Sequence, residues 1–265
     1  MTAVPARGRT AQVLVCRPGA GGRAPDRVIV EEPMEIRLDD HLVTTTMRTP
    51  GHDYELAAGF LHGEGLLAGA PVREIRYCAT GSAVETEFNV VSVDTGGRAP
   101  VPQPRLVTTS AACGLCGSQS IDQLTARLSP LPEPAPVDHA VLATLTGRVR
   151  EQQELFDTTG SVHAAAVFDP RTGEILLVRE DIGRHNAVDK VVGRMLLDGR
   201  LPATGLGLFV SGRASFEMVQ KAWAAGFGLV AAVSGPSSLA VEAARAANLA
   251  LVGFLRGEAM NVYTP

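Results

Sequence analysis

Alternation of apolar and polar residues predicts β-structure in the first half of the chain. Apolar residues between Val28 and Leu38 alternate with polar ones, and Asp39-Asp40 predicts a hairpin turn from which the chain returns over 41–47. A helix is expected to follow Asp53 and to end near Gly63, with further strands over 72–78 and 84–93 in a meander. We therefore expect a small α+β domain over 26–107, after a flexible N-terminus over 1–25 in which only 13–15 has strand character.

The hydrophobic pattern changes in the second half. Helical spacing predicts helices over 138–156, 186–198, 215–225 and 237–247, and apolar runs predict strands over 163–168, 175–178, 206–210, 228–234 and 249–254. Alternating helices and strands are typical of an α/β layer fold, with a mainly parallel sheet behind a leading hairpin. The expected class is thus α/β for residues 137–265 and α+β overall. Residues 108–136, which include a Pro-rich run, are expected to bridge the domains.

Composition narrows the class of protein. The 265 residues are 45% hydrophobic and 20% charged, which is a globular composition rather than a disordered one. A net charge of -4 gives no global positive field that would favour nucleic acid. We see no apolar run long enough to cross a membrane and no signal peptide, so the expected location is the cytoplasm. There the four cysteines are expected to be thiols.

Two of these thiols, Cys113 and Cys116, lie three residues apart, and each is followed by glycine. Backbone N–H groups near a helix start lower the pKa of such a thiol, and the thiolate is the reactive form. Four interpretations are open: a persulfide carrier, a structural zinc site, a thioredoxin-like redox pair, and structural thiols without chemistry. A structural zinc site needs two further ligands. A thioredoxin-like redox motif normally follows a strand and has an aromatic residue directly before its first cysteine. We therefore favour the persulfide carrier.

A zinc-dependent deaminase is a further alternative, because these enzymes also contain a Cys-x-x-Cys. Here Ala112 stands where their pattern has proline, and the one upstream match to His-x-Glu, at 62–64, ends a Gly-broken helix. We therefore expect no catalytic zinc.

Polar clusters follow three of the predicted strands. The segment 179–190 carries Arg184, His185 and Lys190, and Ser211-Gly212-Arg213 and 234–238 are two strand–Ser–Gly–turn–helix junctions. Ligands bind at the carboxyl ends of strands in open α/β sheets, and basic side chains with helix N-termini suit phosphate. Taken singly, each cluster is equally compatible with surface ion pairs or helix capping. Three of them on one sheet edge favour a shared anionic ligand.

Two more segments are candidates. The C-terminal residues Met260, Asn261, Val262, Tyr263, Thr264 and Pro265 offer polar groups for a base or ribose, or form a fraying tail. In the first half, Arg48, His52 and Asp53 are candidates for a pocket wall, or for plain helix capping with an exposed histidine.

Five segments together resemble one known family. They are Met47-Arg48-Thr49-Pro50-Gly51-His52-Asp53, Cys113-Gly114-x-Cys116-Gly117, Glu180-Asp181-x-Gly183-Arg184-His185-Asn186-Ala187-Val188-Asp189-Lys190, Ser211-Gly212-Arg213-x-Ser215-Phe216-Glu217 and Val262-Tyr263-Thr264. From about residue 28 to its end, the chain resembles the formate dehydrogenase accessory sulfurtransferases (FdhD). The long match over 180–190 makes this resemblance more specific than the two thiols alone.

The resemblance implies a homodimer whose second domain has a cytidine-deaminase-like, three-layer fold without the zinc chemistry. It implies that a cysteine desulfurase gives sulfur to the loop, and that the chain passes it to the molybdenum bis(molybdopterin guanine dinucleotide) cofactor for formate dehydrogenase. Cys113 would hold the persulfide, Cys116 would relay sulfur or assist its release, and 260–265 would bind the guanine nucleotide part. The family often has histidine where this chain has Pro265. The alternative is a non-catalytic chaperone that binds the molybdenum cofactor.

Overall fold

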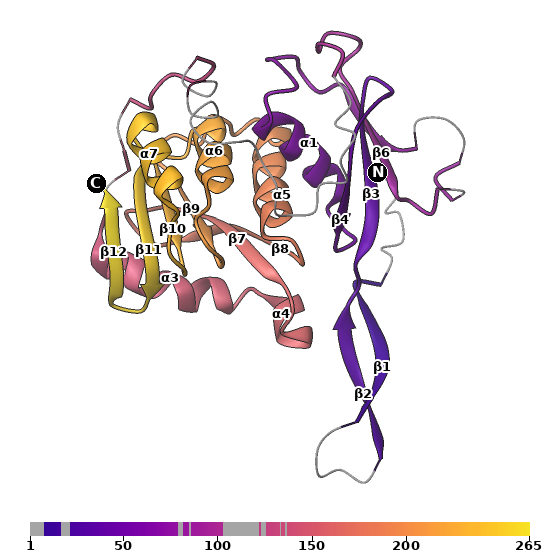
Figure 1. The fold of residues 1–265 in the computed structure, drawn as a ribbon, viewed down its shortest axis with the longest axis horizontal. Helices are drawn as coiled ribbons and strands as arrows, with labels where there is room; N and C mark the ends of the chain where they lie inside the picture. Colours follow the sequence, from indigo (N-terminus) through magenta and orange to yellow (C-terminus); the bar gives the residue numbers. More distant parts are fainter. Residues whose placement is uncertain are drawn as a thin grey trace.

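The computed structural model describes residues 8–16, 22–78, 82–84, 86–102, 122, 126–132, 134–135 and 137–265. Within these ranges the strands form three separate sheets, of two, four and six strands (Figure 1). The mixed α and β content agrees with the expected class. No helix among the described residues is long and apolar enough to cross a membrane.

The N-terminal segment contains more strand than its sequence predicts. β1 (Thr10–Cys16) and β2 (Arg23–Ile29) pair antiparallel over their whole length, whereas only 13–15 was expected to be extended. β2 contains Pro25 and two arginines, so it shows no apolar alternation by which the sequence would reveal it.

The four-stranded sheet has the order β4-β3-β6-β5. Its strands are β3 (Glu32–Leu38), β4 (His41–Arg48), β5 (Glu74–Tyr77) and β6 (Val90–Asp94). The hairpin turn predicted at Asp39-Asp40 joins β3 to β4, and both turn residues have positive φ. The predicted meander is wrong, because β6 inserts between β3 and β5 and runs parallel to β3. Residues 83–84 and 86–88 form turns, so the strand expected over 84–93 begins only at Val90.

The six-stranded sheet has the order β12-β11-β10-β9-β7-β8. β7 (His163–Phe168) and β8 (Ile175–Asp181) form the predicted leading hairpin. β9 (Gly207–Val210), β10 (Leu229–Ala232) and β11 (Ala250–Arg256) run parallel, and β12 (Ala259–Thr264) returns antiparallel beside β11. The parallel part is therefore limited to the three central strands.

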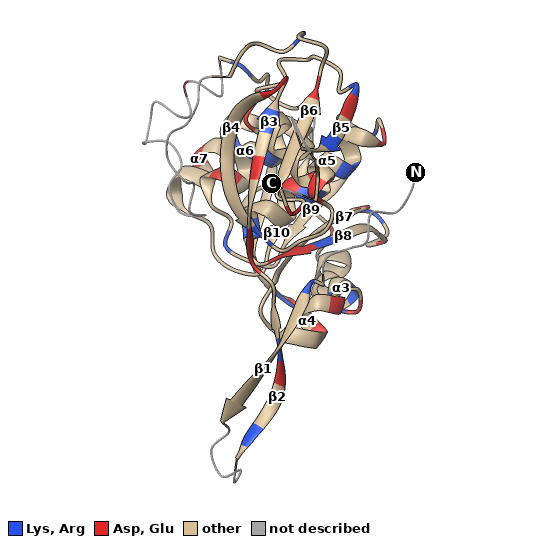
Figure 2. Ribbon diagram, turned by 90° about the vertical axis from the view of Figure 1, so that its right-hand side faces the viewer, with Lys and Arg blue, Asp and Glu red and all other residues tan. Residues whose placement is uncertain are grey.

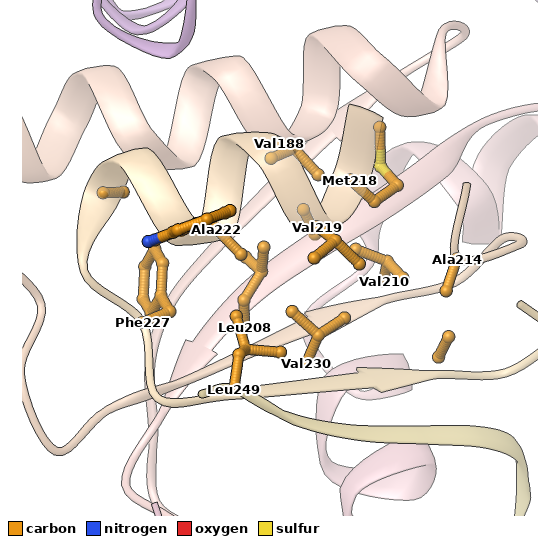
Figure 3. Packing of buried hydrophobic residues seen from close by; sticks show 14 of the residues in the cluster. Val188, Leu208, Val210, Ala214, Met218, Val219, Ala222, Phe227, Val230 and Leu249 are labelled. Atoms are coloured by element: carbon orange, nitrogen blue, oxygen red, sulfur yellow. The ribbon is translucent and has the colours of Figure 1, made fainter. Parts of the chain in front are cut away.

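Helices cover both faces of this sheet. α5 (Arg184–Leu197), α6 (Phe216–Ala225) and α7 (Ser238–Ala247) lie on one face, and α3 (His139–Arg150) lies on the other, followed by the short α4 (Glu154–Thr159) (Figure 1). The helix expected over 138–156 is thus two helices. Buried side chains of α6 pack onto β9 and β10 (Figure 3). The layers agree with a three-layer arrangement, while the cytidine-deaminase-like description and the domain boundaries stay predictions.

The described part of the Pro-rich segment packs against the second domain. Leu131 N donates a hydrogen bond to Ala247 O, and Ala135 N donates to Gly228 O. Trp223 is 2% exposed, and its indole N–H donates to Ser129 O. Residues 129–132 and 134–135 therefore lie on the six-stranded sheet's domain rather than spanning open space.

The two larger sheets are joined through α1 (Asp53–Gly63) and α5, which lie against each other. The helices touch at two glycines: a Cβ at Gly59 would lie 1.8 Å from Asp189 O, and one at Gly193 would lie 1.8 Å from Glu55 O. No side chain fits at either position, which explains why the sequence has glycine inside both helices despite its low helix propensity. This contact fixes α5, and with it the carboxyl end of β8, relative to the first domain.

Candidate functional site

The polar loops after β9 and β10 lie side by side, as predicted. Ala214 and Pro236 form a parallel β-bridge, and Ser234 N donates a hydrogen bond to Gly212 O. The third cluster joins them through Arg184, whose Cδ would lie 3.4 Å from a Cβ at Gly212. The prediction that three polar clusters share one edge of the sheet is therefore confirmed.

These loops enclose a pocket of about 410 Å³, which we call the strand-end pocket. It lies where α5 and α6 begin and where the β10–α7 loop crosses the edge of the sheet. Its lining residues are Arg184, Arg213, Ala214, Ser215, Phe216, Glu217, Gly235, Pro236, Ser237 and Leu239.

Several buried polar atoms at this pocket have no hydrogen-bond partner in the structure. They are Arg184 Nε, His185 Nδ1 and Ser215 Oγ. A buried polar atom without a partner is costly, by about 1–3 kcal/mol, and such atoms are rare in folded proteins. Arg184 and Ser215 line the pocket and His185 adjoins it, so these atoms indicate that a polar ligand completes the site.

Helix N-termini add to the positive potential of the pocket. α7 is capped by its own Ser237, whose Oγ accepts a hydrogen bond from Ala240 N. By contrast, α5 and α6 begin at Gly183 and Ser215 without a side-chain cap. Free N–H groups at a helix start bind anions, so an anion here would take the place of the missing caps.

The charges of the pocket are mixed but predominantly positive. Burial, and then the neighbouring Arg213 guanidinium, lowers the pKa of Arg184. His185 Nε2 lies 2.5 Å from Glu217 Oε2. This contact lowers the pKa of Glu217, although burial opposes it, so Glu217 is ionised at neutral pH. Two guanidinium groups, those of Arg184 and Arg213, line the pocket with the one carboxylate of Glu217, and this excess of positive charge favours an anionic ligand.

Lys190 lies elsewhere. Its ammonium is 1% exposed, lies 2.6 Å from Asp181 Oδ2 and donates a hydrogen bond to Thr49 O. Asn186 makes a similar link, because its Nδ2 donates to Met47 O and to Asp181 Oδ1. The structure thus places Lys190 in the contact between the domains, where its charge is already paired, and not on the pocket. Its predicted role in phosphate binding does not fit this position.

The same contact uses further buried ions. Arg179 pairs with Glu55 of α1, with Nε 2.5 Å from Oε2, and Lys221 of α6 lies 2.6 Å from Asp189 Oδ1 of α5. We call these pairs, together with Lys190–Asp181 and the two glycines, the α1–α5 junction. Every charge named in it has a partner.

The predicted pocket wall in the first domain is also structural. Arg48 is fully buried and binds Asp53 through two hydrogen bonds, and it also donates to Asn89 Oδ1. Neither Arg48 nor Asp53 is open to a ligand, so both are packing residues. The predicted capping is wrong, because α1 begins after His52 without a side-chain cap, and the partly exposed His52 lies 3.5 Å from Glu55 instead.

Ser211 and Gly212 adjoin the pocket without lining it. Ser211 Oγ accepts a hydrogen bond from Ala164 N, and His163 Nδ1 lies 3.4 Å away. Of the residues predicted between 184 and 213, Arg184 and Arg213 therefore line the pocket directly. His185 reaches it through Glu217.

The C-terminal residues form β12 and not a fraying tail, so they are spread along the sheet. Asn261 pairs with Gly253, close to the Ser234 loop, but Thr264 is buried at the other end of β11, where its Oγ1 donates to Leu249 O. Met260 and Asn261 are thus near the strand ends that carry the polar loops. Val262 and Tyr263 follow along β12, and Thr264 and Pro265 lie beside the start of β11. The six residues thus belong to a strand and not to a free tail, and their predicted role in cofactor binding stays a prediction.

Two residues at this edge escaped the sequence analysis. Phe254 has a positive φ of 54° and is 43% exposed, and its ring lies 2.7 Å from where a Cβ of Gly235 would be. His163 is half-buried beside Arg184, and burial followed by the charges of Arg184 and His185 lowers its pKa. Phe254 lies within an apolar run, and His163 is the first residue of an alanine-rich strand, so only the fold reveals them.

Cys113 and Cys116 lie outside the described residues, and their predicted roles stay predictions. Among the residues that are described, no group of three or more His, Cys, Asp or Glu side chains gathers as a metal site would require.

Comparison with known proteins places this geometry in a family. The model of the FdhD/NarQ family matches residues 29–265. The chain is 50% identical to the sulfur carrier protein FdhD of Streptomyces coelicolor and 49% identical to that of Streptomyces avermitilis, each over 262 residues, 95% of this chain and 92% of the relative. The crystal structure of a formate dehydrogenase accessory protein from Desulfotalea psychrophila superposes with a TM-score of 0.71 at 26% identity, covering 97% of this chain and 96% of that one.

Proposed function

Because this chain belongs to the FdhD/NarQ family, whose matched relatives are sulfur carrier proteins, we propose that it carries sulfur for a formate dehydrogenase. We further propose that the sulfur travels as a persulfide on Cys113 and that its acceptor is the molybdenum bis(molybdopterin guanine dinucleotide) cofactor. The observation that supports this acceptor is the set of unpartnered buried polar atoms at the strand-end pocket.

The first step moves one sulfur atom between two thiols. A cysteine desulfurase presents a persulfide, the Cys113 thiolate attacks its outer sulfur, and the desulfurase thiolate leaves. One S–S bond breaks and one forms, so no external electrons are needed. The product is a persulfide on Cys113, which is anionic at neutral pH because a persulfide is more acidic than a thiol.

Release to the cofactor as sulfide needs two electrons. Cys116 can supply them: its thiolate attacks the Cys113 sulfur, the outer sulfur takes one proton from water and leaves as HS⁻ to the acceptor, and a Cys113–Cys116 disulfide remains. A dithiol reductant then restores both thiols. This gives Cys116 the role of assisting release and makes the protein a sulfurtransferase.

The acceptor binds at the strand-end pocket. The cofactor is large and carries several phosphates, and Arg184, Arg213 and Ser215 with the starts of α5 and α6 suit phosphate. Phe254, at the neighbouring loop, offers an apolar face. We propose that this edge, extended by Met260 and Asn261, holds the nucleotide end of the cofactor in a protein that acts as a cytoplasmic homodimer.

Persulfide loading is the direct test. The full-length protein is incubated with a cysteine desulfurase and cysteine, and the intact mass is measured. We expect a gain of one sulfur atom in the wild type and in Cys78→Ala, and none in Cys113→Ala. Undiminished loading of Cys113→Ala would falsify the persulfide step.

The alternative is a chaperone that binds the cofactor without transferring sulfur. The pocket favours binding but says nothing of transfer, so both functions predict cofactor binding. They separate in the loading assay, because the chaperone gains no sulfur in any variant.

A further inference from the structure

His163 lies at the polar edge of the six-stranded sheet. It is the first residue of β7, and because β7 pairs antiparallel with β9, this start lies beside the loop that follows β9. Its Nδ1 lies 3.4 Å from Ser211 Oγ, and this hydroxyl can donate to a neutral imidazole or accept from an imidazolium. A Cβ at Gly212 would lie 3.6 Å from two ring atoms of His163 and 3.4 Å from Arg184 Cδ. The imidazole therefore lies next to an arginine that lines the strand-end pocket.

The carboxylates around this imidazole already have partners. Charged residues of both signs lie along β8 and in α5 (Figure 2). Asp181 of β8 stands opposite the imidazole in the strand pairing, but Lys190 lies 2.6 Å from its Oδ2. The neighbouring Glu180 accepts hydrogen bonds from the first N–H groups of α4, and Glu217 of α6 pairs with His185. An imidazolium here would thus meet the guanidinium groups of the pocket without a carboxylate of its own.

These surroundings favour the neutral imidazole when no ligand is bound. Burial, and then the positive charges of Arg184 and His185, lowers the pKa of His163, and only the charge of Asp181 opposes them. Arg213, whose charge also acts on Arg184, has the same sign. At pH 7 the histidine of the ligand-free protein is therefore predominantly neutral. Two charged arginines and a neutral histidine thus lie together at the edge where an anion is expected.

A phosphate group at the pocket would supply the missing negative charge, because it would offset the charges of Arg184 and Arg213 that disfavour an imidazolium. We propose that His163 is a third cationic group of the strand-end pocket, neutral while the pocket is empty and protonated once a phosphate group is bound. The proton comes from the solvent, so binding is accompanied by proton uptake. This inference rests on the anionic ligand of the proposed function and adds a residue and a proton to its site.

The sign of the pH dependence follows from this order. The bound phosphate raises the pKa of His163 above its value in the ligand-free protein. The contribution of His163 to binding is therefore fully present below the pKa of the ligand-free protein, and it is lost as the pH rises through the pKa of the complex. Affinity for a phosphate ligand should thus be higher at pH 6 than at pH 8.

Calorimetric titration of the full-length protein with GDP, in buffers of different ionisation enthalpy, measures the proton uptake. We expect the wild type to take up more protons per bound GDP than His163→Gln, and its affinity to fall about three- to tenfold more between pH 6 and pH 8. The terminal phosphate of GDP also titrates near pH 6, but equally with both proteins, so the comparison removes its contribution. The matched control is His139→Gln at the exposed start of α3, on the other face of the sheet, and it should behave like the wild type.

An NMR titration of the six imidazoles of the wild type gives a second reading that needs no His163 variant. The His163 signal, assigned through the neighbouring Ala164, should titrate at a higher pH with GDP than without it. In Arg184→Ala without GDP, it should titrate at a higher pH than in the wild type, because a nearby positive charge is gone.

Two kinds of result would overturn the inference, and they differ in what else they remove. GDP binding that leaves the titration of His163 unchanged, or equal proton uptake by the wild type and His163→Gln, removes the role of His163 and leaves the pocket as an anion site. A wild type that binds no GDP removes the proposed nucleotide site together with this inference. The two failures are therefore distinguishable.

Discussion

The α1–α5 junction and the strand-end pocket are both dense in charge, but they differ in whether the charges have partners. At the junction, Lys190 lies 2.6 Å from Asp181, and Arg179 is paired with Glu55. At the pocket, Arg184 Nε and Ser215 Oγ are buried without partners. Satisfied buried charges hold two domains in place, whereas unsatisfied ones indicate a ligand. Both regions use residues of the segment 179–190. Arg184 of this segment lies at the pocket, whereas Arg179 and Lys190 lie at the junction.

Breaking the Lys190–Asp181 pair should have the largest effect. Lys190→Met leaves Asp181 buried with an unpaired charge, which costs about 3–5 kcal/mol of unfolding free energy. Urea unfolding measures this loss. The double variant Lys190→Met with Asp181→Leu removes both charges and should recover part of the stability. If Lys190→Met unfolds like the wild type while nucleotide binding is lost, Lys190 belongs to the pocket and the comparison fails.

Adding one methyl group between α1 and α5 should have the second largest effect. Gly193→Ala puts a Cβ where Glu55 O lies 1.8 Å away, so α1 and α5 must move apart. We expect a loss of about 1–3 kcal/mol. Gly147→Ala in α3 is the matched control, because nothing lies within 4 Å of its Cβ, and it should stabilise by about 0.5–1 kcal/mol. Equal effects of the two substitutions in urea unfolding would contradict the close helix contact.

At the pocket, Arg184→Ala should weaken ligand binding without loss of stability. We expect affinity for GDP, a soluble probe for the nucleotide end of the cofactor, to fall about 10- to 100-fold, because one charge-assisted hydrogen bond is lost. Calorimetric titration measures the affinity. Arg194→Ala is a suitable control for affinity, since Arg194 pairs with Asp198 and Glu55 away from the pocket. Reduced stability with unchanged affinity would make Arg184 a structural residue like Lys190.

The smallest effect is the pH dependence of the junction. Burial tends to raise the pKa of Glu55, but hydrogen bonds from Arg179 and His52 outweigh it and lower that pKa to about 2. A carboxyl with a lowered pKa stabilises the fold fully above its unfolded pKa and loses this contribution as the pH falls toward 2. We expect Glu55 to account for about 1–2 kcal/mol between pH 6 and pH 3, after allowance for solvent screening. Urea midpoints at the two pH values should converge in Glu55→Gln, and equal pH dependence in both proteins would exclude Glu55 as the source.

The sequence predicts the second domain better than the site within it. Apolar periodicity identifies α6, α7 and the central strands closely, because their buried faces follow the helical and strand periods. It misses β2, whose arginines and proline hide the strand, and it takes β12 as a possible tail because Asn261 and Thr264 are polar. Such elements are set by pairing with a neighbouring strand, which a local pattern does not report.

The same limit applies to functional residues. Arg184 and Lys190 are six positions apart in one polar segment, and nothing in their spacing says that one reaches the pocket and the other Asp181. The direction of α5, fixed by the contact of Gly59 with Gly193, decides this. Phe254 is an apolar residue in an apolar run until the backbone turns it outward at positive φ. Residue types predict the chemistry of a ligand, and the fold decides which residues meet it.

The missing side-chain caps of α5 and α6 link ligand occupancy to the dynamics of the fold. The first turns of these helices have N–H groups that only water or a ligand can satisfy. An anion that binds there stabilises the folded state by mass action, so the melting temperature should rise with ligand concentration. Amide hydrogen exchange should slow first at the starts of α5 and α6, and not at α7, which Ser237 already caps. The starts of α5 and α6 would thus open more often in the ligand-free protein than in the ligand-bound one.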